Sequence, residues 1–352
     1  MKKLYTFLIL FMIGFTSHAQ DDNKSHKGLY FGFKTGYTIP VAKSTIGSPR
    51  TEVGNRILVS SNTGTYSYSE KNPFGTRGAG VQVAGSIGYM FNNNFGIEME
   101  FSFLRSARIL DGSRDETSLI NTVERNYFAE QYSYTNMFRA APMLVVSGNP
   151  SKKFVPYAKF GLILPLAGKT IVEVTINDET GELADLLLPI LNRDLSDKLN
   201  GMRDFIPFVI PTESFIKAKT AGVFSLGFTA RMGCSYNIND KWSIFGEMEM
   251  TMLTVKAKET EFVEFSSRVS NDALVILAEL LLQESIQSEF GYNDLPEILR
   301  LTSYANELTQ ASNGSYDVNA VGFDRNSAYN QVTFRDNYNS FGLMLGFKYK
   351  FK

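Results

Sequence analysis

The chain has 352 residues with 35 basic and 36 acidic side chains, so its formal net charge is −1. This balance excludes the global positive field that draws a protein onto nucleic acid, and we expect no nucleic-acid partner. Beyond the first 15 residues, no apolar run is long enough to cross a bilayer as a helix. This does not exclude a membrane barrel, because only alternate strand residues face lipid there. Aromatic residues make up 13% of the chain and glycine occurs 28 times, which favours such a barrel.

The N-terminus has the pattern of an export signal. Lys2 and Lys3 precede an apolar run over residues 4–15, and small residues follow up to Ala19. This order predicts a cleavable signal peptide over residues 1–19, and the run is too short for a membrane-spanning helix. Residues 20–27 are polar and are expected to form a flexible N-terminal segment. The only cysteine, Cys234, lies in a predicted strand, so no cysteine at the cleavage site offers a lipid attachment point.

Eight segments alternate apolar residues with small or polar ones, at the two-residue period of a β-strand. They cover residues 28–41, 80–91, 95–103, 132–146, 154–166, 222–236, 242–255 and 341–351. In the last segment, for example, Phe341, Leu343 and Leu345 lie on one face, while the other face carries glycine, methionine and lysine. A soluble sheet buries its apolar face in its own core, whereas glycine and charge on the second face suit a polar barrel interior.

The connections between these segments alternate in length. Short turns follow the second, fourth and sixth segments, whereas residues 42–79, 104–131, 167–221 and 256–337 form long connections. Short turns on one side and long loops on the other are typical of outer-membrane barrels. We therefore predict an all-β fold in residues 28–352: a single transmembrane antiparallel up-and-down β-barrel of about eight strands, with long extracellular loops containing helices. Aromatic residues near the short turns are expected to form an interfacial girdle.

The long connections are predicted to be partly ordered. Residues 170–176 continue the strand alternation and residues 215–220 can pair with them, so the barrel is expected to extend above the bilayer. Residues 183–202, 272–290 and 294–310 are predicted helices. We expect loops 167–221 and 256–337 to form a helical cap over the barrel mouth. The alternative is a groove for an apolar ligand or a partner helix, lined by Leu274, Ile276, Leu277, Leu280, Leu281 and Leu282.

Alternation also directs nine charged side chains into the predicted barrel. They are Lys34, Glu98, Glu100, Arg139, Lys159, Arg231, Glu247, Glu249 and Lys348. The interior of an eight-stranded barrel is only wide enough to be filled by side chains, and buried charges are costly unless paired. We therefore predict a lumen ion-pair network that supports rigidity and closes the pore, with a proton or ion path as the alternative.

The signal ending Ser17-His18-Ala19-Gln20, the hairpin spacing and the final strand Gly346-Phe347-Lys348-Tyr349-Lys350-Phe351 together define a family resemblance. The chain resembles the small bacterial outer-membrane β-barrels, the porin-like or outer-membrane-protein-A/X-like eight-stranded barrels. The resemblance implies a place in the cell outer membrane, contact with outer-membrane lipid, and recognition of the C-terminal strand by the barrel assembly machinery. It does not imply one activity, because such barrels act as adhesins, stabilisers, enzymes and transport accessories.

The sequence offers little for catalysis. Its two histidines are His18, within the predicted signal peptide, and His26, before the first strand, whereas the hydrolytic and acyl-transfer barrels that it resembles rely on a histidine. We expect no enzyme activity, no metal site and no cofactor. The predicted function is that of a non-enzymatic outer-membrane barrel acting as a binding, accessory or structural component, with a protein partner at its extracellular loops. The alternatives are a passive channel or transporter for small, including hydrophobic, solutes, and a surface enzyme.

Overall fold

The structure is a computed structural model. It describes residues 27–41, 44–45, 67–71, 74–120, 123–191, 193–203, 209–271, 275, 279–280, 287–309, 312–313, 324 and 326–351. The predicted signal peptide over residues 1–19 lies outside these residues, as does all of the predicted N-terminal segment except Lys27.

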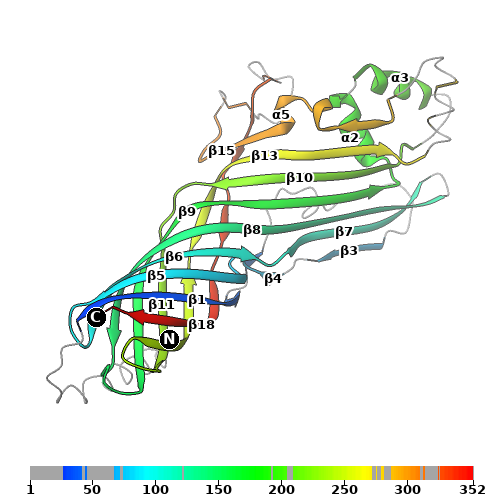
Figure 1. The fold of residues 1–352 in the computed structure, drawn as a ribbon. Helices are drawn as coiled ribbons and strands as arrows, with labels where there is room; N and C mark the ends of the chain where they lie inside the picture. Colours follow the sequence, from blue (N-terminus) through cyan, green and yellow to red (C-terminus); the bar gives the residue numbers. More distant parts are fainter. Residues whose placement is uncertain are drawn as a thin grey trace.

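In the described part of the chain, eight antiparallel strands close into a barrel (Figure 1). They are β1 (Gly28–Pro40), β5 (Gly80–Met90), β6 (Phe95–Ser106), β8 (Val123–Ser147), β9 (Phe154–Asp178), β11 (Gly227–Asn237), β12 (Trp242–Met252) and β18 (Ser340–Lys350). The ring runs in that order, and β18 closes it on β1 in unbroken register from Tyr30↔Lys350 to Pro40↔Ser340. The predicted all-β transmembrane barrel is confirmed, and each of the eight predicted segments overlaps one of these strands. Residues 222–226 of the sixth segment precede β11, and residues 253–255 of the seventh lie beyond β12.

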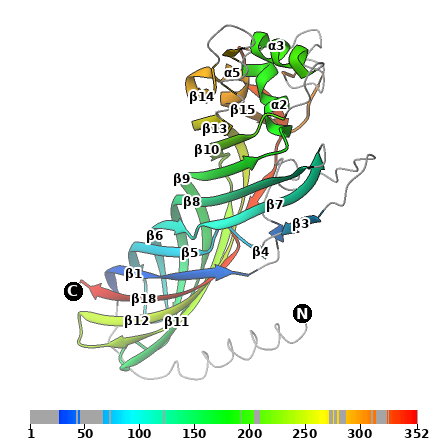
Figure 2. The same ribbon diagram turned by 90° about the vertical axis from the view of Figure 1, so that its right-hand side faces the viewer.

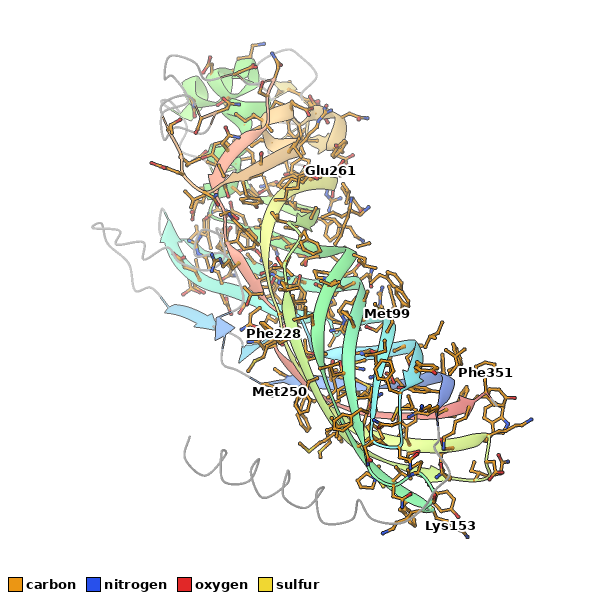
Figure 3. All side chains as sticks on the ribbon, turned by 90° about the vertical axis from the view of Figure 1, so that its left-hand side faces the viewer. Met99, Lys153, Phe228, Met250, Glu261 and Phe351 are labelled. Atoms are coloured by element: carbon orange, nitrogen blue, oxygen red, sulfur yellow. The ribbon has the colours of Figure 1, made fainter. Side chains whose placement is uncertain are left out.

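The strands have the two faces that the alternation predicts. Large apolar side chains point away from the lumen and stay exposed, as at Phe101, Ile244 and Leu345. Figure 3 labels Met99, Phe228 and Met250 on this outer wall. In a bilayer this surface faces lipid, so its exposure carries no hydrophobic penalty, while alternate polar residues turn inward.

Part of the wall continues far beyond the barrel. Strands β8 and β9 are each 25 residues long, whereas about 9–11 residues are enough for a strand to span a bilayer. Beyond the barrel, β10 (Thr212–Gly222) pairs with β9, and the predicted pairing is present as Phe215↔Thr175 through Thr220↔Thr170. On its other edge β10 pairs with β13 (Thr254–Val269), and β7 (Ile109–Ile120) pairs with β8. We call this sheet the extension (Figures 1 and 2).

Short strands complete the sheets. On the edges of the extension lie β3 (Ser67–Lys71), β14 (Glu289–Gly291), β15 (Leu301–Ala305), β16 (Tyr329–Val332) and β17 (Arg335–Asn337). A separate pair is formed by β2 (Ser44–Thr45) and β4 (Phe74–Gly75).

The predicted helix over residues 183–202 is present as two helices, α2 (Glu182–Leu191) and α3 (Arg193–Arg203). Asp178, at the end of β9, accepts backbone hydrogen bonds from Gly181 at 3.0 Å and Leu183 at 2.6 Å, which satisfies two donors where α2 begins. Apolar side chains of the helices and the extension form a buried cluster of Ala184, Leu188, Leu199, Ile210, Phe265, Phe290 and Leu295. The helices therefore pack at the far end of the extension, whereas we expected a cap over the barrel mouth (Figure 2).

The predicted helix over residues 294–310 is wrong beyond its first turn. A 3-10 turn (Tyr292–Asp294) and one helical turn, α5 (Glu297–Arg300), lead directly into β15. Strand β15 pairs with β13, with Leu301 opposite Glu261. The edge of β13 presents backbone groups that β15 can pair with. A short helix is only marginally stable without tertiary contacts, so pairing with β13 outweighs the local helical pattern.

Most of the predicted helix over residues 272–290 lies outside the described residues. Within the described chain, no helix combines the length and apolar character needed to cross a membrane.

The single tryptophan of the chain reports on the membrane position of the barrel. Trp242 begins β12 at the short-turn end, is 43% exposed, and packs against Tyr349 with ring centroids 4.9 Å apart. In vesicles of brominated lipid, we expect its fluorescence to be quenched more strongly by bromine near the headgroups than by bromine near the bilayer centre. Stronger quenching from the centre would contradict this placement.

Candidate functional site

The lumen contains a layer of buried charge. Eight of the nine predicted lumen residues meet there, contributed by six strands: Lys34 from β1, Glu98 and Glu100 from β6, Arg139 from β8, Lys159 from β9, Arg231 from β11, and Glu247 and Glu249 from β12. Each is at most 3% exposed. The two carboxylates of β6 and the two of β12 are spaced by two residues, so each strand directs both inward.

The contacts join these eight residues into one network. The Lys34 ammonium lies between β6 and β12, 3.0 Å from Glu100 and 2.9 Å from Glu249. Arg231 reaches the same two carboxylates, donating two hydrogen bonds to Glu100 and lying 3.3 Å from Glu249. On the side nearer the short turns, Lys159 lies 2.9 Å from Glu98 and 3.3 Å from Glu247. Four cations thus face four carboxylates, and the layer is internally neutral.

Several uncharged residues also belong to the network but are absent from the predicted set, among them Gln82, Tyr30 and Tyr157. Gln82 accepts a hydrogen bond from Arg139 at 2.6 Å and donates to Glu249 at 3.3 Å. Tyr30 donates to Glu98 at 2.6 Å, and Tyr157 donates to Glu247 at 3.0 Å. All three lie at inward positions of their strands, so the two-residue period of a strand predicts that they point into the lumen. Tyrosine and glutamine are uncharged at neutral pH, so a prediction based on charged residues does not include them.

Lys348, the ninth predicted residue, lies outside this balance. Its ammonium is 4.5 Å from the centre of the Tyr30 ring and 5.3 Å from that of Tyr157. Among the described residues, no carboxylate oxygen lies within ion-pairing distance of it. The position of Lys348, between the charged layer and the short turns, leaves one cation of the lumen without a carboxylate partner.

Beyond the charged layer, toward the extension, the lumen contains an apolar layer. It is made by the buried cluster of Leu104, Met137, Ile163, Leu253, Val255 and Tyr338. Tyr338 also contacts Thr170, with their hydroxyl oxygens 3.0 Å apart. An eight-stranded barrel leaves little interior space besides its side chains, so these two layers oppose passage of water and ions.

A second ionic group lies above the apolar layer, outside the membrane-spanning part of the strands. Arg77 contacts Asp111 of β7 at 3.3 Å and Asp336 of β17 at 3.1 Å. Burial raises the pKa of the Asp336 carboxyl, against the opposing effect of the Arg77 charge. The sequence assigns all three residues to long loops, and only the pairing of β7 and β17 with the extension brings them together.

The barrel wall has an opening between β9 and the descending strand formed by β10 and β11. Strand β9 pairs with β11 up to Ile163↔Gly227 and with β10 from Lys169↔Ala221. Residues 164–168 and 222–226 lie between these ladders without pairing to each other, although the register is the same above and below. We call this break in the wall the lateral opening.

Two local features account for the lateral opening. Pro165 lies in its β9 edge and has no backbone N–H to donate. On the other edge, the Val223 N–H donates to the Lys256 carbonyl of β13 at 2.7 Å, which turns this segment away from β9. Apolar side chains line the rim: Leu166 is 53% exposed and Phe224 is 68% exposed. A cavity of about 210 Å³ runs from this rim inward to Met137 and Tyr338.

The predicted apolar loop surface is described at one residue. Leu280 is 74% exposed, whereas Leu274, Ile276, Leu277, Leu281 and Leu282 lie outside the described residues. No group of histidine, cysteine, aspartate or glutamate within the described chain has the arrangement of a metal site.

Breaking the charged layer should destabilise the barrel strongly. Arg231→Met leaves Glu100 and Glu249 buried with fewer partners, and we expect it to lower the free energy of unfolding in lipid vesicles by about 3–5 kcal/mol. Arg268→Met is the matched control, because Arg268 and its partner Glu213 are 57% and 51% exposed. The control should change stability by about 1 kcal/mol or less. Equal effects in urea titrations would mean that water reaches the network.

Comparison with known proteins identifies the family to which the chain belongs. A search of curated protein sequences gave no match. Among solved structures, the outer membrane protein OprG from Pseudomonas aeruginosa aligns at 14% sequence identity and a TM-score of 0.34, over 94% of this chain and 99% of that one. The sequence model of the outer membrane protein beta-barrel domain matches residues 7–270, well over half of the chain. The protein therefore belongs to the outer membrane protein beta-barrel domain family.

Proposed function

We propose that this protein is a non-enzymatic binding or accessory component of the outer membrane that recruits a protein partner through its extension. The observation that carries the proposal is the length of β8 and β9, more than twice what a membrane span requires. A barrel that served only as a membrane anchor would not need this additional sheet, or helices packed at its far end.

The orientation follows from the general rule for such barrels. Short turns lie on the periplasmic side and long connections lie outside, so the extension with α2 and α3 projects from the cell. The chain reaches this location by means of the predicted signal peptide over residues 1–19, and β18, which closes the ring, would be the strand that the assembly machinery recognises. The two buried layers of the lumen support a binding role over an ion-conducting one.

The β9–β10 hairpin provides a clean test, because Asp178 is directly opposite Thr212. Replacing residues 179–211 by Asn-Gly should close this hairpin with a two-residue turn and remove α2 and α3 while leaving the barrel strands unchanged. We expect proteins that copurify from outer membranes with the full chain to be lost with the shortened one. Heat-modifiable migration on gels checks that both forms fold. Equal copurification with both forms would contradict docking at the helices.

A second candidate function rests on the lateral opening: passage of a small apolar solute between the outside and the membrane. The cavity behind the opening ends at the apolar layer, so such a solute would leave through the wall without crossing the charged layer. Its volume of about 210 Å³ is smaller than the roughly 300 Å³ of typical ligand pockets. It therefore suits a small solute or part of an acyl chain.

A disulfide across the opening tests this candidate. Continuing the register places Ala167 opposite Val223, so the pair Ala167→Cys and Val223→Cys, made in a Cys234→Ala background, should join the two edges when oxidised. We expect oxidation to slow uptake of a small apolar dye into vesicles, and reduction to restore it. Phe160→Cys with Ala230→Cys, within a paired stretch, is the control and should change nothing. Unchanged uptake in the sealed variant would exclude this route.

A further inference from the structure

The short-turn end of the barrel contains a cavity separate from the lateral opening. It has a volume of about 580 Å³, and it extends from the turn over residues 150–153 and from Asp240 inward to Tyr30 and Tyr157. We call it the vestibule. Figure 3 labels Lys153 and Phe351 at this end of the molecule. The charged layer lies directly behind it, since Tyr30 donates to Glu98 and Tyr157 to Glu247.

The charge of the vestibule is strongly one-sided. Its described lining includes five lysines, Lys27, Lys152, Lys153, Lys348 and Lys350, and one acidic residue, Asp240. The described lining residues therefore carry a formal net charge of +4, although the whole chain has a formal net charge of −1. Low-dielectric walls concentrate such a potential within a cleft, which raises the local concentration of anions.

Lys348 distinguishes the vestibule from a ring of surface lysines. It is partly buried at the inner end, where the rings of Tyr30 and Tyr157 lie beside it. The four carboxylates of the lumen are matched by Lys34, Arg139, Lys159 and Arg231, so Lys348 is an excess cation in a confined space. A buried charge without a partner is costly, and an anion in the vestibule would offset that cost.

The types of side chain indicate the kind of anion. Among the described residues, the cations that line the vestibule are all lysines, whereas Arg139 and Arg231 belong to the charged layer. Arginine suits planar, two-pronged recognition of carboxylate and phosphate alike, whereas lysine acts as a mobile point charge and is a common ligand of phosphate. Several lysines around one cavity therefore suit a compact anion that carries more than one negative charge, as a phosphate group does. We propose that the vestibule binds a phosphate-bearing anion, with Lys348 at the inner end and the rim lysines around it.

The probe for this proposal is inorganic pyrophosphate, titrated by calorimetry at low salt into the full chain in phosphatidylcholine nanodiscs. We expect saturable binding, weakened at least tenfold by Lys348→Met. Lys241→Met is the matched control, because Lys241 is exposed in the adjoining turn and does not line the cavity. Its affinity should stay within twofold of that of the unmodified chain. Heat-modifiable gel migration verifies folding, and Lys152→Gln with Lys153→Gln, on an exposed turn, gives a second weakened variant.

Nanodiscs of phosphatidylglycerol distinguish the two sources of phosphate. If pyrophosphate binding is suppressed in them, a lipid headgroup occupies the vestibule, and if binding is unchanged, the ligand is a soluble phosphate compound. Both results support the proposal. Three results would overturn it: no binding of pyrophosphate to the unmodified chain, equal binding by Lys348→Met, or citrate binding as tightly as pyrophosphate.

Discussion

The constraint on which this structure depends is that lipid offers no hydrogen-bond partner to the peptide backbone. Every N–H and C=O group at membrane depth must pair within the protein, and a closed ring of strands satisfies this requirement without an exposed edge. The unbroken register between β1 and β18 completes the ring. This constraint applies only within the membrane. Strand β13, which follows β12 in the chain, does not continue the barrel wall in line with β12 and instead pairs with β10 in the extension. The lateral opening lies beside this departure of β13, between the β9–β11 and β9–β10 ladders.

The same ring sets a second condition, because it encloses a narrow interior from which most water is excluded. The eight charged residues of the lumen are tolerable only because they are matched in number and linked through shared partners. Lys34 and Arg231 both contact Glu100 and Glu249, so the strands β1, β6, β11 and β12 are tied together across the lumen as well as along the wall. These ion pairs therefore hold opposite sides of the barrel together, in a place where a soluble protein would have an apolar core.

Much of this architecture follows from the sequence, because a strand has a side-chain period of two. That period is enough to locate all eight barrel strands and to direct Glu98, Glu100, Glu247 and Glu249 inward. It cannot distinguish Lys348, which forms no ion pair with a described carboxylate, from Lys34, which forms several, since pairing depends on the relative heights of residues in different strands. The strand at Leu301–Ala305 was missed for a related reason: its partner on β13 is distant in sequence, while its local pattern favours a helix. The lateral opening is also invisible to periodicity, because residues 222–226 read as ordinary strand.

The ladders above and below the lateral opening fix its dimensions. Five residues of extended chain span about 17 Å, and the paired stretches at both ends prevent the break from lengthening unless hydrogen bonds are broken. Only its width can vary, according to how far the segment around Val223 bows toward β13. The break is therefore a slit of fixed length. In the proposed passage of apolar solutes, such a slit would select by thickness: a flexible chain or a flat ring would pass edge-on, whereas a bulky or branched molecule of the same volume would be held back.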